Sequence, residues 1–286
     1  MPVWPARLLW QRIETIHAVT YFAPESIGAA RAAGLRGFWM GYFGFRACPL
    51  GAVGPEPVEA AFANFAGPMV ARAVPDAWTY ARPEQLRRIR AESAAGALRR
   101  CSTSVVRSAA EASDALSAAI AEASPLGRPM FAANRSVELL DDPVGCLWQQ
   151  CTTLREHRGD GHVAALAAAG VDGCEAHLLL AADQGIDPHV FLEHRGWTSD
   201  QQEAARERLS DRGLLLAGVL TEVGHAVRAD VESITDRIAA EPFLRSIGEP
   251  GLLAAIDALT PAALEVARSG ILPFPNPMGL PQLAAG

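Results

Sequence analysis

The chain has 286 residues, of which half are hydrophobic and 20% are charged, and its net charge is −7. This length suits one large domain or two small ones, and the frequent alanine favours a globular, mainly helical protein. All 25 basic residues are arginine, which is typical of high-GC codon usage. Proteins whose main partner is nucleic acid usually carry a positive stripe, so a DNA-binding role has to be reconciled with the negative charge.

The sequence shows neither a membrane-spanning segment nor a secretory leader. No run of apolar residues is long enough to cross a bilayer, and residues 1–16 lack the basic, apolar and cleavage regions of a signal peptide. We therefore expect a cytoplasmic protein with no membrane partner. The five cysteines have no CxxC spacing, and in a reducing compartment we expect them to be buried as small hydrophobic residues rather than joined in disulfides or bound to zinc.

Glycine and proline divide the first part of the chain into short helices. We expect one helix to end near Gly34 and a second, aromatic one to run to about Cys48. A further helix starts near Pro55 and is interrupted at Gly67–Pro68. Residues 82–101 predict an amphipathic helix. Its apolar face contains Leu86, Ile89, Ser93 and Leu98, and its solvent-facing side contains Arg87, Arg88, Arg90 and Glu92.

The middle of the chain offers a candidate domain boundary. Residues 102–130 are rich in small side chains and predict a helix flanked by looser joints. Asp142 then has the place of an N-cap before Pro143, and a helix follows to Arg158.

Residues 172–240 follow the order helix, helix-turn-helix, two-stranded wing and helix. Helices are expected over 172–185, 187–196 and 198–212, the last with Thr198 or Ser199 as N-cap and with Gly213 as a left-handed stop. Two short apolar strands then turn at Ala217–Gly218, and a long helix starts at about Glu222. This is the order of a winged helix.

The same segment resembles the MarR-like winged helix-turn-helix proteins, in which an acidic helix ending in RGLL leads through a wing to the pattern LTxxGxxxR. Those motifs are present here as Arg212–Leu215 and as Leu220, Thr221, Gly224 and Arg228. The whole chain is also similar to an uncharacterised bacterial family with such a domain, and the resemblance implies a regulator. We expect four regions: helical and aromatic-rich (1–130), connecting helices (131–171), winged helix (172–245), and a C-terminal helix with an extended tail (246–286).

In a winged helix the third helix normally enters the major groove and the wing touches phosphate. Here that helix sets three arginines against four carboxylates, and the wing has no basic residue. A homodimer could gather arginines from elsewhere, so double-stranded DNA stays open as a partner. The side chains expected to read DNA are Ser199, Gln201, Gln202, Arg206 and Arg208.

Residues 154–166, LREHRGDGHVAAL, concentrate ionisable groups in a chain rich in alanine and leucine. Since glycine costs about 1 kcal/mol relative to alanine inside a helix, Gly159 and Gly161 predict a break in which Asp160 caps a second helix. His157 would then end one helix and His162 begin the next, and these opposed environments could separate their pKa values for acid–base catalysis. The cluster, with Glu156 and Arg158, is either a structural joint or a ligand anchor facing a cavity.

Five of the seven histidines lie in residues 157–194, but none has the spacing of an HExxH metal site. His177 has the pattern of a core or interface histidine, whereas His189 and His194 are expected to face solvent. No metal ligand set or cofactor is therefore assigned.

The stretch GLRGFWMGYFGFRACPLG, residues 34–51, combines five aromatic residues with a smooth glycine face. It is either ordinary core packing or an aromatic pocket with arginine at its mouth, suited to a planar, acidic small molecule. The candidate ligand-binding residues there and on neighbouring helices are Arg36, Trp39, Tyr42, Phe43, Arg46, Asn64 and Trp78.

These patterns lead to one principal hypothesis, a small-molecule-binding winged-helix protein that acts as a ligand-responsive transcriptional regulator. The alternative is a repurposed winged-helix enzyme or resistance protein of specialised metabolism. Its substrate would bind between the helical region and the winged helix, with His157, Asp160 and His162 as catalytic residues. A third possibility is a protein-interaction module. No P-loop, GxGxxG or nucleophile elbow supports a kinase, dehydrogenase or hydrolase.

Overall fold

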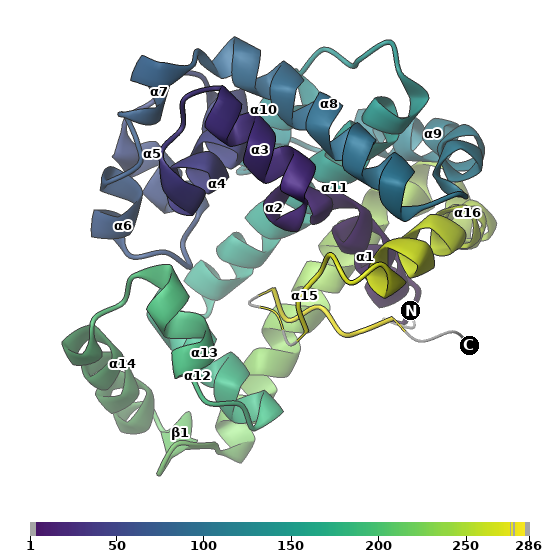
Figure 1. The fold of residues 1–286 in the computed structure, drawn as a ribbon. Coiled ribbons are helices and arrows are strands. Elements are labelled where there is room, and N and C mark those ends of the chain that lie inside the picture. Colours follow the sequence, from purple (N-terminus) through teal and green to yellow (C-terminus); the bar gives the residue numbers. More distant parts are fainter. Residues whose placement is uncertain (1–3, 275, 277, 284–286) are drawn as a thin grey trace.

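A computed structural model describes residues 4–274, 276 and 278–283 (Figure 1). The fold is mainly α-helical with one small antiparallel sheet, as the sequence predicts. A large helical body occupies the upper part of Figure 1 and the winged helix the lower left, and two long helices run between them. These are α11 (Pro143–Ala168) and α15 (Glu222–Ser246).

The helical body begins with eight helices and one 3-10 turn. They are α1 (Trp4–His17), α2 (Val19–Phe22), α3 (Pro24–Ala32), α4 (Gly37–Ala47), η1 (Cys48–Leu50), α5 (Pro55–Ala61), α6 (Gly67–Ala71), α7 (Ala77–Tyr80) and α8 (Pro83–Cys101). The body is completed by α9 (Val105–Glu122), α10 (Pro129–Arg135) and α16 (Gly248–Arg268). The expected interruption after α5 is confirmed, because α6 starts separately at Gly67.

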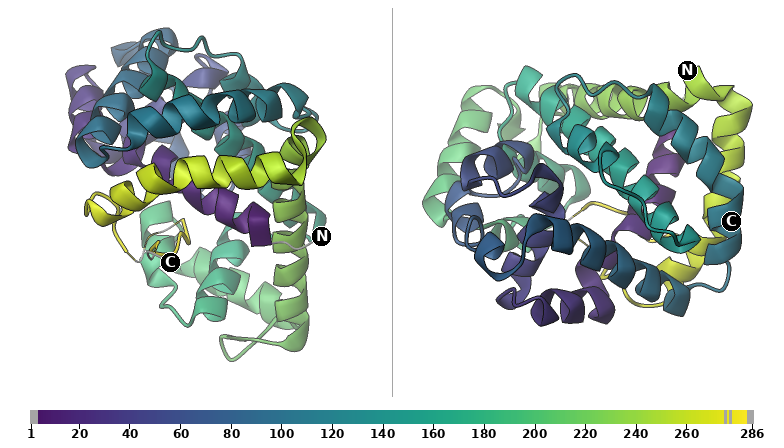
Figure 2. Two further views of the ribbon diagram at one scale, coloured as in Figure 1. Left: turned by 90° about the vertical axis from the view of Figure 1, so that its right-hand side faces the viewer. Right: turned by 90° about the horizontal axis from the view of Figure 1, so that it is seen from above.

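The main core lies where α1, α9, α11 and α16 pack together. Many of its buried side chains are alanine, which lets the helices approach closely, and Trp148 of α11 is the largest side chain that is fully buried. Figure 2 shows α16 lying across the body and meeting α15 at a steep angle. By length and composition α16 could cross a bilayer, contrary to the expectation that no apolar run is long enough. Half of its apolar window is buried, however, and supplies the core.

A second apolar cluster surrounds α4. Phe43, Phe62 and Phe65 are all nearly inaccessible there, and the Phe43 ring contacts both of the others. Ordinary core packing therefore accounts for this part of the aromatic stretch. The glycine face is also used, because a Cβ on Gly41 or Gly44 would approach Ala30 or Leu35 to 3.1 Å.

The winged helix consists of α12 (Gly173–Gln184), α13 (His189–Leu192), η2 (Glu193–Arg195), α14 (Ser199–Asp211), β1 (Leu215–Leu216) and β2 (Val219–Leu220), followed by α15. Its predicted local signals are confirmed. The Thr198 hydroxyl accepts the Gln201 amide at 3.3 Å as an N-cap, and Gly213 has φ 67°. Ala217 and Gly218, with φ 49° and 80°, make the tight turn of the wing.

The predicted break in residues 154–166 is wrong, since α11 continues through it from Pro143 to Ala168. Gly161 has a packing role: a Cβ there would lie 2.8 Å from Cγ2 of Ile238 on α15. Gly159 lines an internal cavity. Close helix contact and cavity space, rather than chain reversal, explain why both glycines fit inside the helix.

Arg90 also departs from expectation, because it is 2% exposed rather than on the solvent side of α8. Its guanidinium donates to the Phe45 carbonyl at 2.8 Å, to Asn134 Oδ1 at 2.8 Å and to Gln149 Oε1 at 3.1 Å. It therefore joins the end of α4 to α10 and α11. A helical periodicity cannot distinguish this buried arginine from an exposed one, since its partners lie far away in the sequence.

Candidate ligand cavity and nucleic-acid face

A cavity of about 950 Å³ lies between the helical body and the winged helix. Its walls come from α1, α2, α4 and α11 on one side and from α12, η2 and α15 on the other, with Met278 and Gly279 of the C-terminal tail beside them. This volume suits a ligand of drug-like size. The cavity therefore has the place that the alternative hypothesis gave to a substrate.

One wall of the cavity is aromatic. Phe38, Trp39 and Tyr42 of α4 line it together with Phe65, and the Trp39 and Phe65 ring centroids are 5.8 Å apart with the planes at 75°. Edge-to-face pairs of this kind hold the rings in fixed orientations. The guanidinium of Arg195, from η2, stacks 4.3 Å from the Phe65 ring centroid, so the aromatic wall leads directly to a cation.

Arginines converge beside Tyr42. Arg46 binds Glu156 through two hydrogen bonds, from Nε to Oε1 at 3.0 Å and from Nη2 to Oε2 at 3.2 Å. Its Nη1 donates to the Tyr42 hydroxyl at 3.2 Å. Arg155 of α11 pairs with Glu14 at 3.2 Å and with Glu156 at 2.9 Å. The carboxylates thus fix the orientation of Arg46 and Arg155, and the positive guanidinium groups of both arginines remain next to the cavity.

The pKa values of Glu156 and Tyr42 are both lowered by the positive charge of the neighbouring arginines. Burial alone would raise the pKa of Glu156, but Arg155 and Arg46 lower it to about 2. Burial would likewise raise the pKa of the Tyr42 phenol, yet Arg46, Arg195 and Arg155 outweigh it and bring that pKa below its usual range. An anion placed beside the Tyr42 hydroxyl would gain from the same three guanidinium groups.

A chain of buried hydrogen bonds leads from the Trp148 carbonyl to Tyr21, which lines the cavity near Tyr42. The Thr152 hydroxyl donates to the Trp148 carbonyl at 2.8 Å, so its oxygen accepts from His17 Nδ1 at 2.9 Å. The other ring nitrogen of His17 then accepts the Tyr21 hydroxyl at 2.8 Å. Burial, followed by Arg155, holds the pKa of His17 well below its ordinary value, which keeps the ring neutral. The direction of every hydrogen bond in the chain is fixed.

The opposite end of the cavity is a set of ion pairs between α1, α11 and α15. Arg158 contacts Asp236 at 3.3 Å, and Arg7 contacts Glu232 at 2.7 Å and Asp236 at 2.8 Å. Next to them His162 Nδ1 lies 3.0 Å from the Thr235 hydroxyl. Burial lowers the pKa of His162 to about 4. This end carries mixed charge and ties the two long helices together.

The structure brings some of the predicted ligand-binding residues together. Those that line the cavity are Trp39, Tyr42, Arg46, Asn64 and Arg158. Glu156 lies behind Arg46 and orients it, whereas Phe43 is enclosed in the apolar cluster. Arg36 is exposed and stacks 4.7 Å from the Tyr80 ring, and Trp78 donates to the Val53 carbonyl at 2.8 Å. Both therefore lie away from the aromatic wall.

The expected meeting of His157, Asp160 and His162 does not occur. Because α11 is continuous, His157 and His162 are turned by roughly 140° from one another about its axis. His157 contacts the Phe131 ring, 4.9 Å away between centroids, and only His162 of the three lines the cavity. Asp160 caps a different helix from the one predicted, since its Oδ2 accepts the Phe131 amide of α10 at 2.9 Å.

The presumed DNA-reading residues have mixed positions. Ser199 and Gln201 are exposed at the start of α14, where the Gln201 side chain closes the capping box. Gln202 is buried and donates to the Trp197 carbonyl at 3.1 Å, so its side chain points away from any DNA on this face. Arg206 pairs with Glu203 at 3.1 Å.

Arg208 is also engaged within the protein. It contacts Asp172 at 2.6 Å and Glu175 at 2.8 Å, which places it against the start of α12. Leu216 and Val219 are exposed on the wing, 74% and 65%, where a phosphate-binding wing would carry basic side chains.

The end of the cavity where Arg46, Arg155 and Arg195 lie near Tyr42 is called the arginine-rich end. Sequence reasoning missed four of its residues, Glu14, Tyr21, Arg155 and Arg195. Arg155 lies inside the stretch that was singled out, but its neighbours there gave no reason to prefer it. The others sit in separate elements without a local motif, and Arg195 directly follows His194 on the exposed-looking turn of the helix-turn-helix. His177 is buried as expected, while His189 and His194 are exposed at the cavity rim.

Comparison with known proteins shows the family of this chain. A family described as "Helix-turn-helix family" matches residues 6–273. No curated protein and no solved structure matches the chain significantly.

Proposed function

Because the chain belongs to a helix-turn-helix family that covers residues 6–273, we propose that it is a small-molecule-binding winged-helix protein that regulates transcription in response to its ligand. The observation that carries the proposal is the cavity, whose walls are shared by the helical body and by α12, η2 and α15 of the winged helix. The order of helices, wing and long final helix supports a MarR-like type of domain.

A ligand in this cavity would touch both parts of the protein at once. Trp39 belongs to the helical body and Arg155 to α11, which packs against that body, whereas His177 and Arg195 belong to the winged helix. A ligand that binds one relative placement of these parts better than another shifts the population toward that placement. Since α14 is joined to η2 by only a few residues, such a shift would move the presumed recognition helix.

The arginines on α14 that could contact DNA are already in ion pairs within the protein. Arg206 and Arg208 already bind carboxylates of the same domain, so contact with phosphate would have to compete with these pairs. The Arg206–Glu203 pair is exposed and such pairs are worth only about 0–1 kcal/mol, so a polyanion could displace it, whereas Arg208 also pairs with the buried Glu175. We propose a homodimer in the cytoplasm, in which two winged helices share the operator.

The test is binding to fluorescently labelled duplex from upstream of the coding sequence, and to random duplex, at increasing salt. We expect the logarithm of the affinity to fall linearly with the logarithm of salt concentration. Arg206→Gln should lower that slope by about 1, because it removes one candidate phosphate or base contact. The matched control is Arg107→Gln, an exposed arginine on α9 in the helical body, which should leave the slope unchanged.

If the wild-type protein binds neither duplex at the lowest salt, the regulator proposal fails. An equal loss of slope in the Arg206 and Arg107 variants would show that any binding is non-specific attraction over the whole surface.

The paired arginines and the apolar wing support a second candidate, an enzyme or a resistance protein that binds its small molecule without DNA. Its cavity residues would be those of the arginine-rich end rather than the dispersed His157 and Asp160. A purified protein that retains a small molecule, detected by mass spectrometry after denaturation, and that has no affinity for DNA would favour this candidate.

A further inference from the structure

The hydrogen-bond roles at the arginine-rich end restrict what the cavity can bind there. The Tyr42 oxygen accepts from Arg46 Nη1 at 3.2 Å, and the positive charge of Arg195 also acts on this hydroxyl. A phenolic hydroxyl that accepts such a bond still has its own hydrogen to donate.

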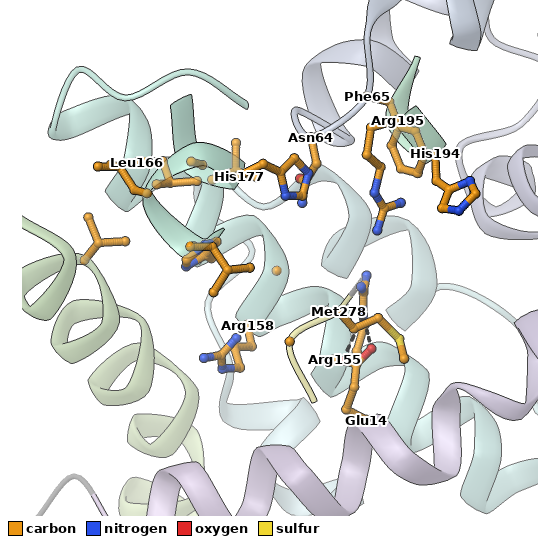
Figure 3. A pocket seen from close by; sticks show the side chains of 18 of the residues that line it. Glu14, Asn64, Phe65, Arg155, Arg158, Leu166, His177, His194, Arg195 and Met278 are labelled. Carbon is orange, nitrogen blue, oxygen red and sulfur yellow. Dashed lines mark hydrogen bonds and ion pairs between the residues drawn. The ribbon is translucent and has the colours of Figure 1, made fainter. Parts of the chain in front are cut away.

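The arginines at this end also have a common direction. Arg155 reaches into the cavity from α11 and Arg195 from η2, and Figure 3 shows their guanidinium groups pointing toward one another. Arg155 is held in this direction by Glu14 and Glu156, both of which are almost fully buried. Guanidinium groups carry donors and no acceptor. The Tyr42 hydroxyl lies beside them, and the acceptors at this end, the Glu14 and Glu156 carboxylates, are already engaged by Arg155 and Arg46.

The neighbouring surface is apolar and aromatic. Trp39 and Phe65 continue from Tyr42 along the cavity, and Phe65 also supports Arg195 at 4.3 Å. A planar apolar group that packed on these rings would bring a substituent at its edge toward Arg195, which already stacks on Phe65. Guanidinium groups beside an aromatic wall suit an aromatic molecule that carries a negatively charged acceptor group.

We propose that the Tyr42 end of the cavity is an oxyanion-binding subsite, in which Arg155, Arg195 and the Tyr42 hydroxyl hold a carboxylate or phosphate of the ligand while Trp39 and Phe65 hold its aromatic part. The proposal rests on the small-molecule function and not on DNA binding. Because Arg155 belongs to α11, which packs in the main core, and Arg195 belongs to the winged helix, the bound oxyanion links the winged helix to that core.

The experiment compares three probes that share one ring system, 1-naphthoate, 1-naphthyl phosphate and the uncharged 1-naphthamide. Binding to the full chain is measured by calorimetry and by quenching of tryptophan fluorescence, since Trp10 and Trp39 line the cavity. We expect at least one anion to bind about tenfold or more tightly than the amide, because hydrogen bonds to a charged group are the strong ones. Whether the carboxylate or the phosphate binds better identifies the oxyanion.

Two variants test whether the preference for the anion over the amide depends on the proposed subsite. Arg195→Gln removes the cation from the winged-helix side, and Tyr42→Phe removes only the hydroxyl, so that one remains informative if the other does not fold. Each should reduce the preference for the anion over the amide to less than about threefold while the amide still binds. The matched control is Arg87→Gln, an arginine outside the cavity that donates to the Cys48 carbonyl at 3.1 Å and should keep the full preference.

Equal binding of anion and amide to the wild type would overturn the subsite, as would failure of all three probes to bind. A preference that survives both cavity variants, or that is lost equally with Arg87→Gln, would also overturn it. A protein that shows the expected preference but binds no DNA retains the subsite and loses the regulator proposal, so the two can fail separately.

Discussion

Asp160 is a residue of α11 whose buried carboxyl group lies against the first turn of another helix, α10. Its Oδ2 accepts the Phe131 amide at the N-terminal end of α10, a position that favours negative charge by about 0.3–1 kcal/mol. Burial opposes this effect and is larger, so the pKa of Asp160 rises to about 7. The carboxyl therefore contributes most to stability when it is protonated.

The sign of the resulting pH dependence follows from linkage. The folded-state pKa lies above the unfolded value of 3.8, so the contribution of Asp160 is complete below that value and is lost as the pH rises through about 7. Asp160→Asn keeps an oxygen acceptor for the Phe131 amide and removes the charge. We expect it to stabilise the protein by on the order of 1 kcal/mol at pH 8 and to flatten the dependence between pH 5 and 8.

The measurement is chemical unfolding at several pH values for the wild type and for both Asp160→Asn and Asp160→Ala. The alanine variant loses the acceptor as well, which should cost about 1 kcal/mol at pH 5, where the wild-type carboxyl is protonated. An asparagine variant that is less stable than the wild type at pH 8 would show that the ionised carboxylate is the favoured form.

At the scale of the element, α11 contains two glycines that are only two residues apart but have opposite packing. A Cβ on Gly159 would meet Glu156 Oε2 at 3.5 Å, an ordinary contact, whereas a Cβ on Gly161 would meet Ile238 at 2.8 Å. Helix propensity favours alanine over glycine by up to about 1 kcal/mol at either position. The two substitutions should therefore change stability in opposite directions.

We expect Gly159→Ala to raise the free energy of unfolding by about 0.5–1 kcal/mol and Gly161→Ala to lower it by about 1–3 kcal/mol through overpacking against α15. Ile238→Ala combined with Gly161→Ala should recover part of that loss, because it removes the clashing side chain. Thermal and denaturant unfolding of the four proteins measure these differences. Equal effects of the two single substitutions would mean that α15 is not held closely against α11.

At the scale of the molecule, the cavity exists because the winged helix leans on the helical body. A Cβ on Gly173, the first residue of α12, would lie 1.7 Å from the Ala63 carbonyl oxygen, so the two backbones touch there. The Ala66 amide also donates to the Arg195 carbonyl at 2.9 Å, and Trp197 Nε1 donates to the Asn64 carbonyl at 2.9 Å. These contacts place η2 opposite α4.

Gly173→Ala should force this contact apart while the main core persists. We expect faster hydrogen–deuterium exchange in α12–α14 and residues 62–66, with little change in α9 and α16, and loss of probe binding in the cavity. Gly28→Ala is the control, since a Cβ there meets no atom within 4 Å. Uniform loss of protection over the whole chain would instead indicate that the winged helix and the body unfold as one unit, which also bears on the expected division into four regions.

The sequence by itself determined the features that depend on residues a few positions apart. The cap at Thr198, the stop at Gly213, the turn at Ala217–Gly218 and the Asp142 cap of α11 are local hydrogen-bond and backbone preferences, and together they predict a winged helix in a mainly helical chain. The aromatic stretch left core packing and a pocket as alternatives, and the structure uses it for both, with Phe43 in the core and Trp39 and Tyr42 on the cavity.

Only the tertiary structure decided how the glycines, buried charges and cavity are used. Gly161 fits inside α11 because Ile238 approaches from another helix, and Arg90 is buried because Phe45, Asn134 and Gln149 supply its acceptors. The arginine-rich end gathers residues from α1, α2, α4, α11 and η2. Contacts between elements far apart in the chain leave no periodic or capping pattern in the sequence, since each depends on the geometry with which the elements pack.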